Sequence, residues 1–362
     1  MRKISSSSSR RRGYIYPSRE DLGAPEALIC YERAESLCVS LDRPLVLFSA
    51  LRGLWRYSLV TDKLSATMRI AKRVYSLARD QNDSALMIGG YRALAVTLYY
   101  LGDLESARRY AMRGVQIWRS GGVESPIEEF TAPAVSCLSF EALSQWHFGE
   151  IVSYRATMAE AVSLAKELNE MRALAIALWH AGILAHFEGD PAEVERLASD
   201  LSELSTRLNF EPFLQRAAVL RGWARSASGN TAEGISWIED GIGDYRATAS
   251  ILDMPFLLAL KAEALHLADR TVESLEAIRE ADALVERFEN RYWSAELHRL
   301  RGLFLAAISA DETEIEASFC EAIRIAREQK SVSLEKRAEA TYAEYHRQKA
   351  SAPAERRFRL PL

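Results

Sequence analysis

The stretch YRALAVTLYYLGDLESARRYAMRGVQIW (Tyr91–Trp118) decides the fold, because it contains two amphipathic segments separated by a helix breaker. Its first half places apolar residues, including Tyr91 and Leu98, on one face at helical spacing, and its second half does the same from Leu104 onward. Between the two halves, Gly102 can adopt the positive φ that ends a helix. The stretch therefore predicts a helix–turn–helix hairpin.

The breaker recurs along the chain at a nearly constant spacing. The intervals between successive breakers are 40, 47, 40, 40, 40 and 41 residues, and the longest is expected to hold an extended loop, Ser120–Phe130. The seven breakers are Asp62, Gly102, Gly149, Gly189, Gly229, Asp269 and Ala310. Such a period is typical of stacked helical repeats. We predict an all-α fold, an α-solenoid of tetratricopeptide-like helix hairpins with a period of about 40 residues, with HEAT-like repeats as the alternative.

Small residues recur at fixed distances from the breakers, and this favours tetratricopeptide-like packing over the HEAT alternative. The recurring residues are Ala95, Ala142, Gly182, Gly222 and Ala262, seven before a breaker, and Gly114, Ala161, Gly241, Ala281 and Ala322, twelve after one. Short side chains at these positions would allow neighbouring helices to approach closely.

The chain divides into a solenoid and two tails. Residues 1–22 are basic and serine-rich and predict a disordered tail, although an organelle transit peptide or a wrongly assigned start remains open. Residues 23–349 predict the solenoid, about seven helix pairs with a lone helix at each end, and residues 350–362 predict a flexible tail. Because neither end shows an obvious polar cap, we expect the chain to be part of a longer solenoid.

Composition argues against several classes of partner. The 362 residues are 48% hydrophobic and carry a net charge of −4, so the sequence predicts no general attraction to nucleic acid or to an anionic membrane. The longest apolar stretch, Ala173–Ala185, is too short to span a bilayer. The four cysteines form no CxxC pair, which indicates neither a disulfide framework nor a zinc site. We therefore expect a cytoplasmic protein with reduced thiols.

Four stretches of the chain look like a bacterial signalling family. They are GAPEALICYERAESLC (Gly23–Cys38), LFSALRGLWRYSLV (Leu47–Val60), LRGWARSASGNTAEGI (Leu220–Ile235) and RYWSAELHRLRG (Arg291–Gly302). In that family a class III adenylate/guanylate cyclase domain precedes a STAND-type ATPase domain and a long tetratricopeptide-like C-terminal region. The chain is also similar to the sensor solenoid of the maltose-regulon transcription activator. The resemblance covers residues 23–349 and is specific to the solenoid region, so it implies a helical repeat module.

The family's enzymatic activities do not extend to this chain. A P-loop needs GxxxxGK[ST], and the sequence contains no Gly-Lys dipeptide. No HExxH, GxSxG or GxGxxG motif occurs, and no strand-rich stretch could supply the paired metal-binding aspartates of a cyclase. We therefore predict no catalytic, cofactor-binding or metal-binding residues.

The first helix of each hairpin is expected to line the concave surface of the solenoid. The residues expected there are Arg52, Arg56, Arg92, Tyr99, Trp146, His147, Trp179, His186, Trp223 and His266. Trp, Tyr and Arg dominate binding hot spots, so one interpretation is a groove for an acidic or extended peptide or a small ligand. The other interpretation is that the aromatic residues pack between repeats.

Three functional hypotheses remain. The first is a non-catalytic repeat module of a bacterial signalling protein that binds a protein partner or a small ligand on its concave face. The second is a fragment or regulatory subunit of an adenylate/guanylate cyclase–ATPase enzyme. The third is a decayed remnant without function, which uncovered end repeats and poor solubility would favour.

Overall fold

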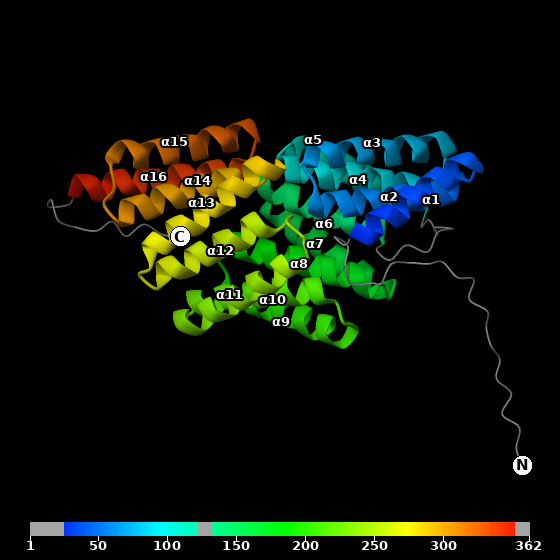
Figure 1. The fold of residues 1–362 in the computed structure, drawn as a ribbon. Coiled ribbons are helices and arrows are strands. Elements are labelled where there is room, and N and C mark those ends of the chain that lie inside the picture. The colour runs from blue at the N-terminus through cyan, green and yellow to red at the C-terminus, as the bar shows by residue number, and fades with distance from the viewer. Residues whose placement is uncertain (1–24, 122–131, 352–362) are drawn as a thin grey trace, which may run out of the picture.

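The computed structural model describes residues 25–121 and 132–351, which form helices joined by short turns and contain no strand. The helices are α1 (Pro25–Ser40), α2 (Pro44–Thr61), α3 (Leu64–Gln81), α4 (Ser84–Leu101), α5 (Leu104–Gly121), α6 (Pro133–His147), α7 (Ile151–Glu167), α8 (Met171–Phe187), α9 (Pro191–Leu208), α10 (Glu211–Ala227), α11 (Thr231–Ala247), α12 (Met254–Leu267), α13 (Thr271–Phe288), α14 (Ser294–Ala307), α15 (Glu312–Glu328) and α16 (Val332–Ser351). From α2 to α15 they pack as successive antiparallel pairs (Figure 1).

Two parts of the sequence prediction lie outside the described residues. The first comprises the two predicted tails. Residues 1–22 lie outside the described ranges, and so do residues 352–362, because α16 ends at Ser351. The other is the extended loop Ser120–Phe130, of which the structure describes only Ser120 and Gly121, and it places both in α5.

The predicted breakers lie at the turns inside the hairpins. Gly102, the breaker of the quoted stretch, has φ +85°, and the other three glycine breakers also have positive φ. Asp269 follows the same rule with φ +60°, whereas Asp62 has φ −111° and ends α2 in an extended conformation. At the last turn the left-handed residue is Ser309 (φ +54°) and not its neighbour Ala310, which the sequence indicated.

The turns between hairpins also contain a residue with positive φ that recurs along the chain, and the sequence analysis did not predict it. Their left-handed residues are Asp42, Asn82, Asn169, Asn209, Ala249, Glu289 and Lys330. Asn and Asp enter this region more easily than most residues, which explains four of the seven positions. Both kinds of turn therefore repeat with the period of the hairpins.

The first helix of each hairpin lies inside the solenoid and the second lies outside. Inner helix α8 is apolar nearly all round and, apart from Ile176, is buried from Ala173 to Phe187. Outer helix α9 buries only one stripe, which includes Val194 and Leu201. A helix that is apolar on every side must be enclosed, whereas one stripe suffices for a helix on the surface.

The recurring small residues bring helices into close contact, as the sequence predicted. A Cβ added at Gly222 of α10 would lie 2.5 Å from the carbonyl oxygen of Gly234 in α11. A Cβ added at Gly114 of α5 would lie 2.6 Å from Sγ of Cys137 in α6. These contacts occur within a hairpin and between hairpins, so the small residues set both spacings.

The solenoid turns far enough for its last hairpins to contact its first ones (Figure 1). The backbone N–H of Ile251, before α12, donates to the carbonyl oxygen of Val60 in α2 at 2.9 Å. The N–H of Arg291, before α14, donates to the carbonyl oxygen of Tyr100 in α4 at 2.7 Å. In α16, Arg337 donates to the carbonyl oxygen of Phe187, the last residue of α8. The C-terminal inner helices thus close one side of the concave surface.

Candidate functional site

A pocket remains open where the N-terminal inner helices face the segment that precedes α12. It crosses five inner helices diagonally, from Leu59 near the end of α2 to Arg172 and Phe213 in the first turns of α8 and α10. Its cavity measures about 140 Å³. An apolar cavity of about 150 Å³ can hold benzene, so this space admits a single ring or one large side chain.

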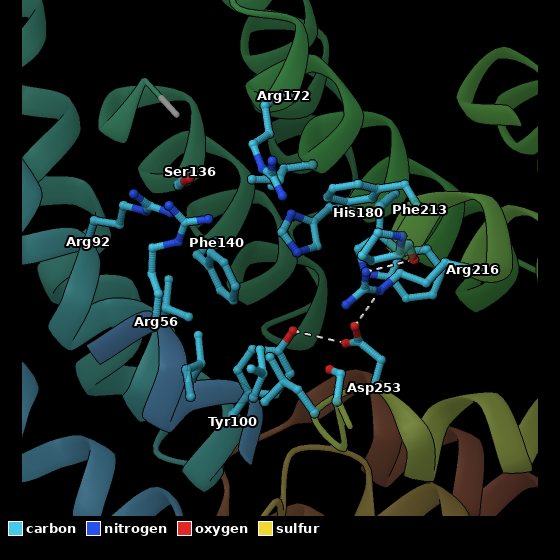
Figure 2. Close-up of a pocket in the computed structure, with 18 of the residues that line it drawn as sticks. Arg56, Arg92, Tyr100, Ser136, Phe140, Arg172, His180, Phe213, Arg216 and Asp253 are labelled. Carbon is cyan, nitrogen blue, oxygen red and sulfur yellow. Dashed lines mark hydrogen bonds and ion pairs between the residues drawn. The ribbon is translucent and has the colours of Figure 1, made fainter. Parts of the chain in front are cut away.

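Arginines from four inner helices approach the pocket. Arg56 comes from α2, Arg92 from α4, Arg172 from α8 and Arg216 from α10 (Figure 2). Arg52 lies one helical turn from Arg56 and contributes to the same positive field, although it does not line the cavity. Among the described residues that line the pocket, the four arginines face a single carboxylate.

The positive charges of the neighbouring arginines lower the pKa of Arg56, which lies on the α2 side of the pocket. Burial, followed by the positive charges of Arg172, Arg92 and Arg52, lowers the pKa of Arg56 to about 9. Arg56 is half-buried and forms no ion pair with a carboxylate of the described residues. Like charges gathered at a partly desolvated surface create a site that an anion would stabilise.

The single carboxylate of the pocket, Asp253, belongs to the opposite wall. Nε of Arg216 donates to it at 2.7 Å, and the hydroxyl of Tyr100 donates to it at 3.2 Å (Figure 2). Burial, and then the charge of Asp253, raises the pKa of Tyr100 well above its usual range, so the phenol keeps its proton. Asp253 is therefore occupied by Arg216 and Tyr100, whereas at the other wall the positive charges of Arg172 and Arg92 act on Arg56.

Apart from the hydroxyls of Ser136, Thr248 and Ser250, the remaining lining side chains are aromatic or apolar. Two of the aromatic side chains carry buried nitrogens without a hydrogen-bond partner. These atoms are Nε1 of Trp179 and Nδ1 of His180. Figure 2 shows the His180 imidazole pointing into the space beside Phe140. The two rings pack edge to face, with 4.9 Å between their centroids. Burial lowers the pKa of His180 to about 4, so the imidazole is neutral near pH 7 and can donate or accept one hydrogen bond at each nitrogen.

Three residues predicted for the concave face line this pocket, and a fourth adjoins it. Arg56, Arg92 and Trp179 line the cavity, and Arg52 stands one turn away. The structure therefore brings together the arginine-rich N-terminal part of the predicted surface.

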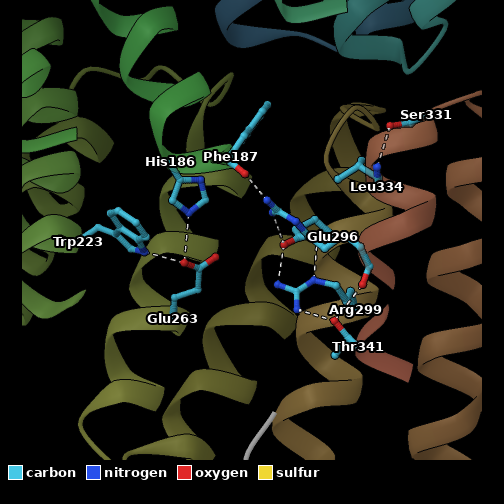
Figure 3. Close-up of polar contacts among 10 residues, drawn as sticks. His186, Phe187, Trp223, Glu263, Glu296, Arg299, Ser331, Leu334 and Thr341 are labelled. Carbon is cyan, nitrogen blue, oxygen red and sulfur yellow. Dashed lines mark hydrogen bonds and ion pairs between the residues drawn. The ribbon is translucent and has the colours of Figure 1, made fainter. Parts of the chain in front are cut away.

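His186 and Trp223 are not exposed to a groove but lie in the interior, where they share one carboxylate. Nε1 of Trp223 donates to Oε2 of Glu263 at 2.6 Å, and Nε2 of His186 lies 3.1 Å from the same oxygen (Figure 3). All three side chains are buried. For these two residues the structure corrects the binding interpretation: closure of the solenoid covers them, and they link α8, α10 and α12.

Tyr99, Trp146 and His147 are also buried, because the last helices cover them. The hydroxyl of Tyr99 lies 3.2 Å from Nε2 of His147, whose Nδ1 lies 2.8 Å from Oγ of Ser331 at the start of α16. The tenth predicted residue, His266, is half-buried and hydrogen-bonds Thr271 inside its own hairpin. None of these four lines the pocket.

The sequence reading missed Arg172, His180, Arg216 and Asp253, and the reason is geometric. It applied similar distances from the breaker to every hairpin. The pocket, however, lies nearer the start of the later inner helices: Arg56 stands six residues before its breaker, whereas Arg172 stands seventeen and Arg216 thirteen residues before theirs. A search that extended the distance to seventeen residues in the later hairpins would have found the two arginines.

The described residues contain neither a metal-binding cluster nor a membrane-spanning helix. No cluster of three His, Cys, Asp or Glu side chains with metal-binding geometry occurs among them. Within the same ranges, no helix is both long and apolar enough to cross a bilayer.

Comparison with known proteins establishes the class of the fold. No family model matches the chain. A Rap protein complexed with Competence and Sporulation Factor superimposes with a TM-score of 0.55, at 14% identity, over 84% of this chain and 95% of that one. The Rap conjugation gene regulator of plasmid pLS20, in complex with the Phr* peptide, gives a TM-score of 0.52 at 10% identity over 92% and 98%. The chain is thus a tetratricopeptide-like helical solenoid, and at these identities the likeness shows the fold alone.

A curated protein of Rhizobium meliloti (strain 1021), described as uncharacterized, is 28% identical over 123 residues. The match covers 34% of this chain and 12% of that protein, so the aligned stretch is a small part of a much longer relative. The comparisons match helical repeats and do not show the cyclase–ATPase context that the resemblance implies.

Proposed function

We propose that the chain is a non-catalytic binding module of a bacterial signalling protein, working in the cytoplasm, which receives a ligand or the end of a protein partner in its concave-face pocket. The observation that carries this proposal is the pocket itself, where arginines from four inner helices surround a cavity with aromatic walls. Clefts that combine apolar walls with a few convergent polar groups are the usual binding sites of proteins.

The fold supports this function. Both Rap structures are complexes, one with Competence and Sporulation Factor and the other with the Phr* peptide, so solenoids of this shape accommodate ligands. Ligand binding to this chain would act through the spacing of the hairpins, because the pocket contacts α2, α4, α6, α8, α10 and the turn before α12. A ligand with different affinities for two curvatures of the solenoid would shift the balance between them.

A blocking substitution tests the proposal. Ile176 lines the pocket on α8, and Ile176→Trp adds a ring that fills much of the cavity. Val272→Trp adds the same ring on α13, where the side chain is 62% exposed. Saturation-transfer NMR against a mixture of small organic acids, amines, sugars and short peptides would identify the ligands of each protein.

We expect ligands that bind the wild type and the Val272→Trp variant but not the Ile176→Trp variant. Ligands that bind all three proteins equally, or an absence of ligands, would contradict a binding role for the pocket. Assays of ATP hydrolysis and nucleotide cyclisation should give background rates, and measurable turnover would overturn the non-catalytic assignment.

A further inference from the structure

The charges of the pocket indicate which ligands it would select. We propose that it binds a small acid, a carboxylate or a phosphate that carries a ring-sized apolar group. This inference rests on the proposed function, because it assigns a chemistry to the same pocket. Such a group could be a free small organic acid or the C-terminal residue of a peptide, and the experiment below distinguishes the two sources.

The anionic end of the ligand follows from the charge balance. Arg56, Arg92, Arg172 and Arg216 line the cavity, and the single carboxylate among the described lining residues is Asp253. Asp253 already accepts hydrogen bonds from Arg216 and Tyr100. A ligand oxyanion would therefore lie at the opposite wall, where the positive charges of Arg172, Arg92 and Arg52 act on the half-buried Arg56. The planar N–H donors of a guanidinium group match carboxylate and phosphate oxygens.

The apolar end of the ligand follows from the size and the walls of the cavity. Its volume of about 140 Å³ fits one ring and not an extended peptide segment. Phe140, Ile176 and Phe213 line it, and an amine placed among four arginines would be repelled. The enclosed part of the ligand is therefore a single aromatic or branched aliphatic group.

Two buried nitrogens independently indicate that a polar ligand belongs in this space. Trp179 and His180 are 3% and 4% exposed, and neither Nε1 of Trp179 nor Nδ1 of His180 has a hydrogen-bond partner. Buried polar atoms in proteins are nearly always paired, because an unpaired one costs about 1–3 kcal/mol. The indole N–H can only donate, so it needs an acceptor such as an oxygen of the bound acid.

The experiment uses probes that share one phenyl ring and differ in the charge of the attached group. Phenylacetate, phenylacetamide and phenethylamine carry the same ring, and isothermal titration calorimetry would measure their affinities for the whole chain at pH 7. We expect phenylacetate to bind at least about tenfold more tightly than phenylacetamide, and phenethylamine not to bind. Phenyl phosphate should bind as well, because it presents the same oxyanion next to the same ring.

Arginine variants locate the anion. Arg56→Gln should weaken phenylacetate binding about tenfold or more while leaving the weak binding of phenylacetamide unchanged. Arg69→Gln, an exposed arginine on outer helix α3, is the matched control and should bind like the wild type. Circular dichroism melting of both variants shows whether they remain folded.

Peptide probes distinguish the two sources. N-acetylphenylalanine is compared with a hexapeptide that ends in phenylalanine, with a free and with an amidated C-terminus. Tighter binding of the free-acid hexapeptide indicates a peptide terminus, and loss of binding on elongation indicates a free small acid. Equal binding of the acid and amide forms in every pair would overturn the oxyanion assignment.

Failure of this inference can be separated from failure of the proposed function. If phenylacetate and phenylacetamide bind equally, and Ile176→Trp abolishes both, the pocket binds ligands but does not select anions. If Ile176→Trp leaves phenylacetate binding unchanged, the ligand lies elsewhere and both proposals fail.

Discussion

Two buried histidines show how single residues respond to closure of the solenoid. His147, the last residue of α6, contacts Tyr99 of α4 and Ser331 just before α16, and burial, followed by the charge of Arg337, lowers its pKa to about 3. Burial lowers the pKa of His180, at the wall of the pocket, to about 4. Both residues are therefore neutral in the folded protein near pH 7, whereas in the unfolded chain they would take up a proton near their ordinary value of 6.5.

We expect the protein to lose stability as the pH falls from 7 to 5. In this range the unfolded chain binds more protons at these two positions than the folded chain, so acid favours unfolding. Each histidine should lower the free energy of unfolding by about 2 kcal/mol over these two pH units. Urea unfolding at pH 7, 6 and 5 measures the slope. His147→Gln should reduce the stability lost between pH 7 and pH 5 by about 2 kcal/mol, and an unchanged slope would contradict this assignment.

At the scale of the element, two glycines in neighbouring helices differ in how closely the next helix packs against them, although both lie inside a helix. A Cβ at Gly222 of α10 would press against the carbonyl oxygen of Gly234 and against Ile238 in α11. A Cβ at Gly243, inside α11, would have nothing within 4 Å. The spacing within the hairpin therefore depends on the first glycine and not on the second.

The two alanine variants should have opposite effects. Gly222→Ala should destabilise the protein by about 2 kcal/mol, because α10 and α11 must separate to accept the methyl group. Gly243→Ala should stabilise it by about 0.5–1 kcal/mol, because alanine is the better helix former. Thermal unfolding of the two variants measures both changes, and a stability loss of similar size in both would show that packing does not set the helix spacing.

The hairpins could be predicted from the sequence because each repeat contains its own evidence: a breaker, apolar stripes and a small residue at a fixed distance. The pocket could not be predicted in the same way. Its position depends on a rotation that accumulates over several hairpins, so Arg216 enters near the start of α10 while Arg56 enters near the end of α2. Burial of Trp223 and Tyr99 likewise depends on hairpins that are far away in sequence.

At the scale of the whole molecule, polar contacts join the last helix to the middle of the solenoid. Arg337 of α16 donates to the carbonyl oxygen of Phe187 in α8 and forms an ion pair with Glu296 of α14 at 3.1 Å (Figure 3). Burial alone would raise the pKa of Glu296, but Arg299 and Arg337 outweigh it and lower that pKa to about 2. The carboxylate therefore stays ionised and holds both arginines.

Removal of Arg337 should loosen the closed form. Arg337→Met should lower the free energy of unfolding by about 1–3 kcal/mol, because it removes a charged hydrogen-bond donor from the buried Glu296, which keeps Arg299, and from the carbonyl oxygen of Phe187. Hydrogen exchange should rise at the end of α8 and in α16. Arg324→Met removes an exposed arginine that pairs with Glu321 and Glu328, and it should cost less than about 1 kcal/mol. Equal effects of the two variants would show that closure does not depend on this contact.

The most direct test of the account is the position of a ligand in the solenoid. Crystals of the protein grown with 4-bromophenylacetate would show the bromine atom by its anomalous scattering. We expect one dominant bromine peak in the cavity between Phe140, Trp179 and Phe213. The carboxylate should lie toward Arg56. A bromine peak on the outer helices, with an empty cavity, would contradict it.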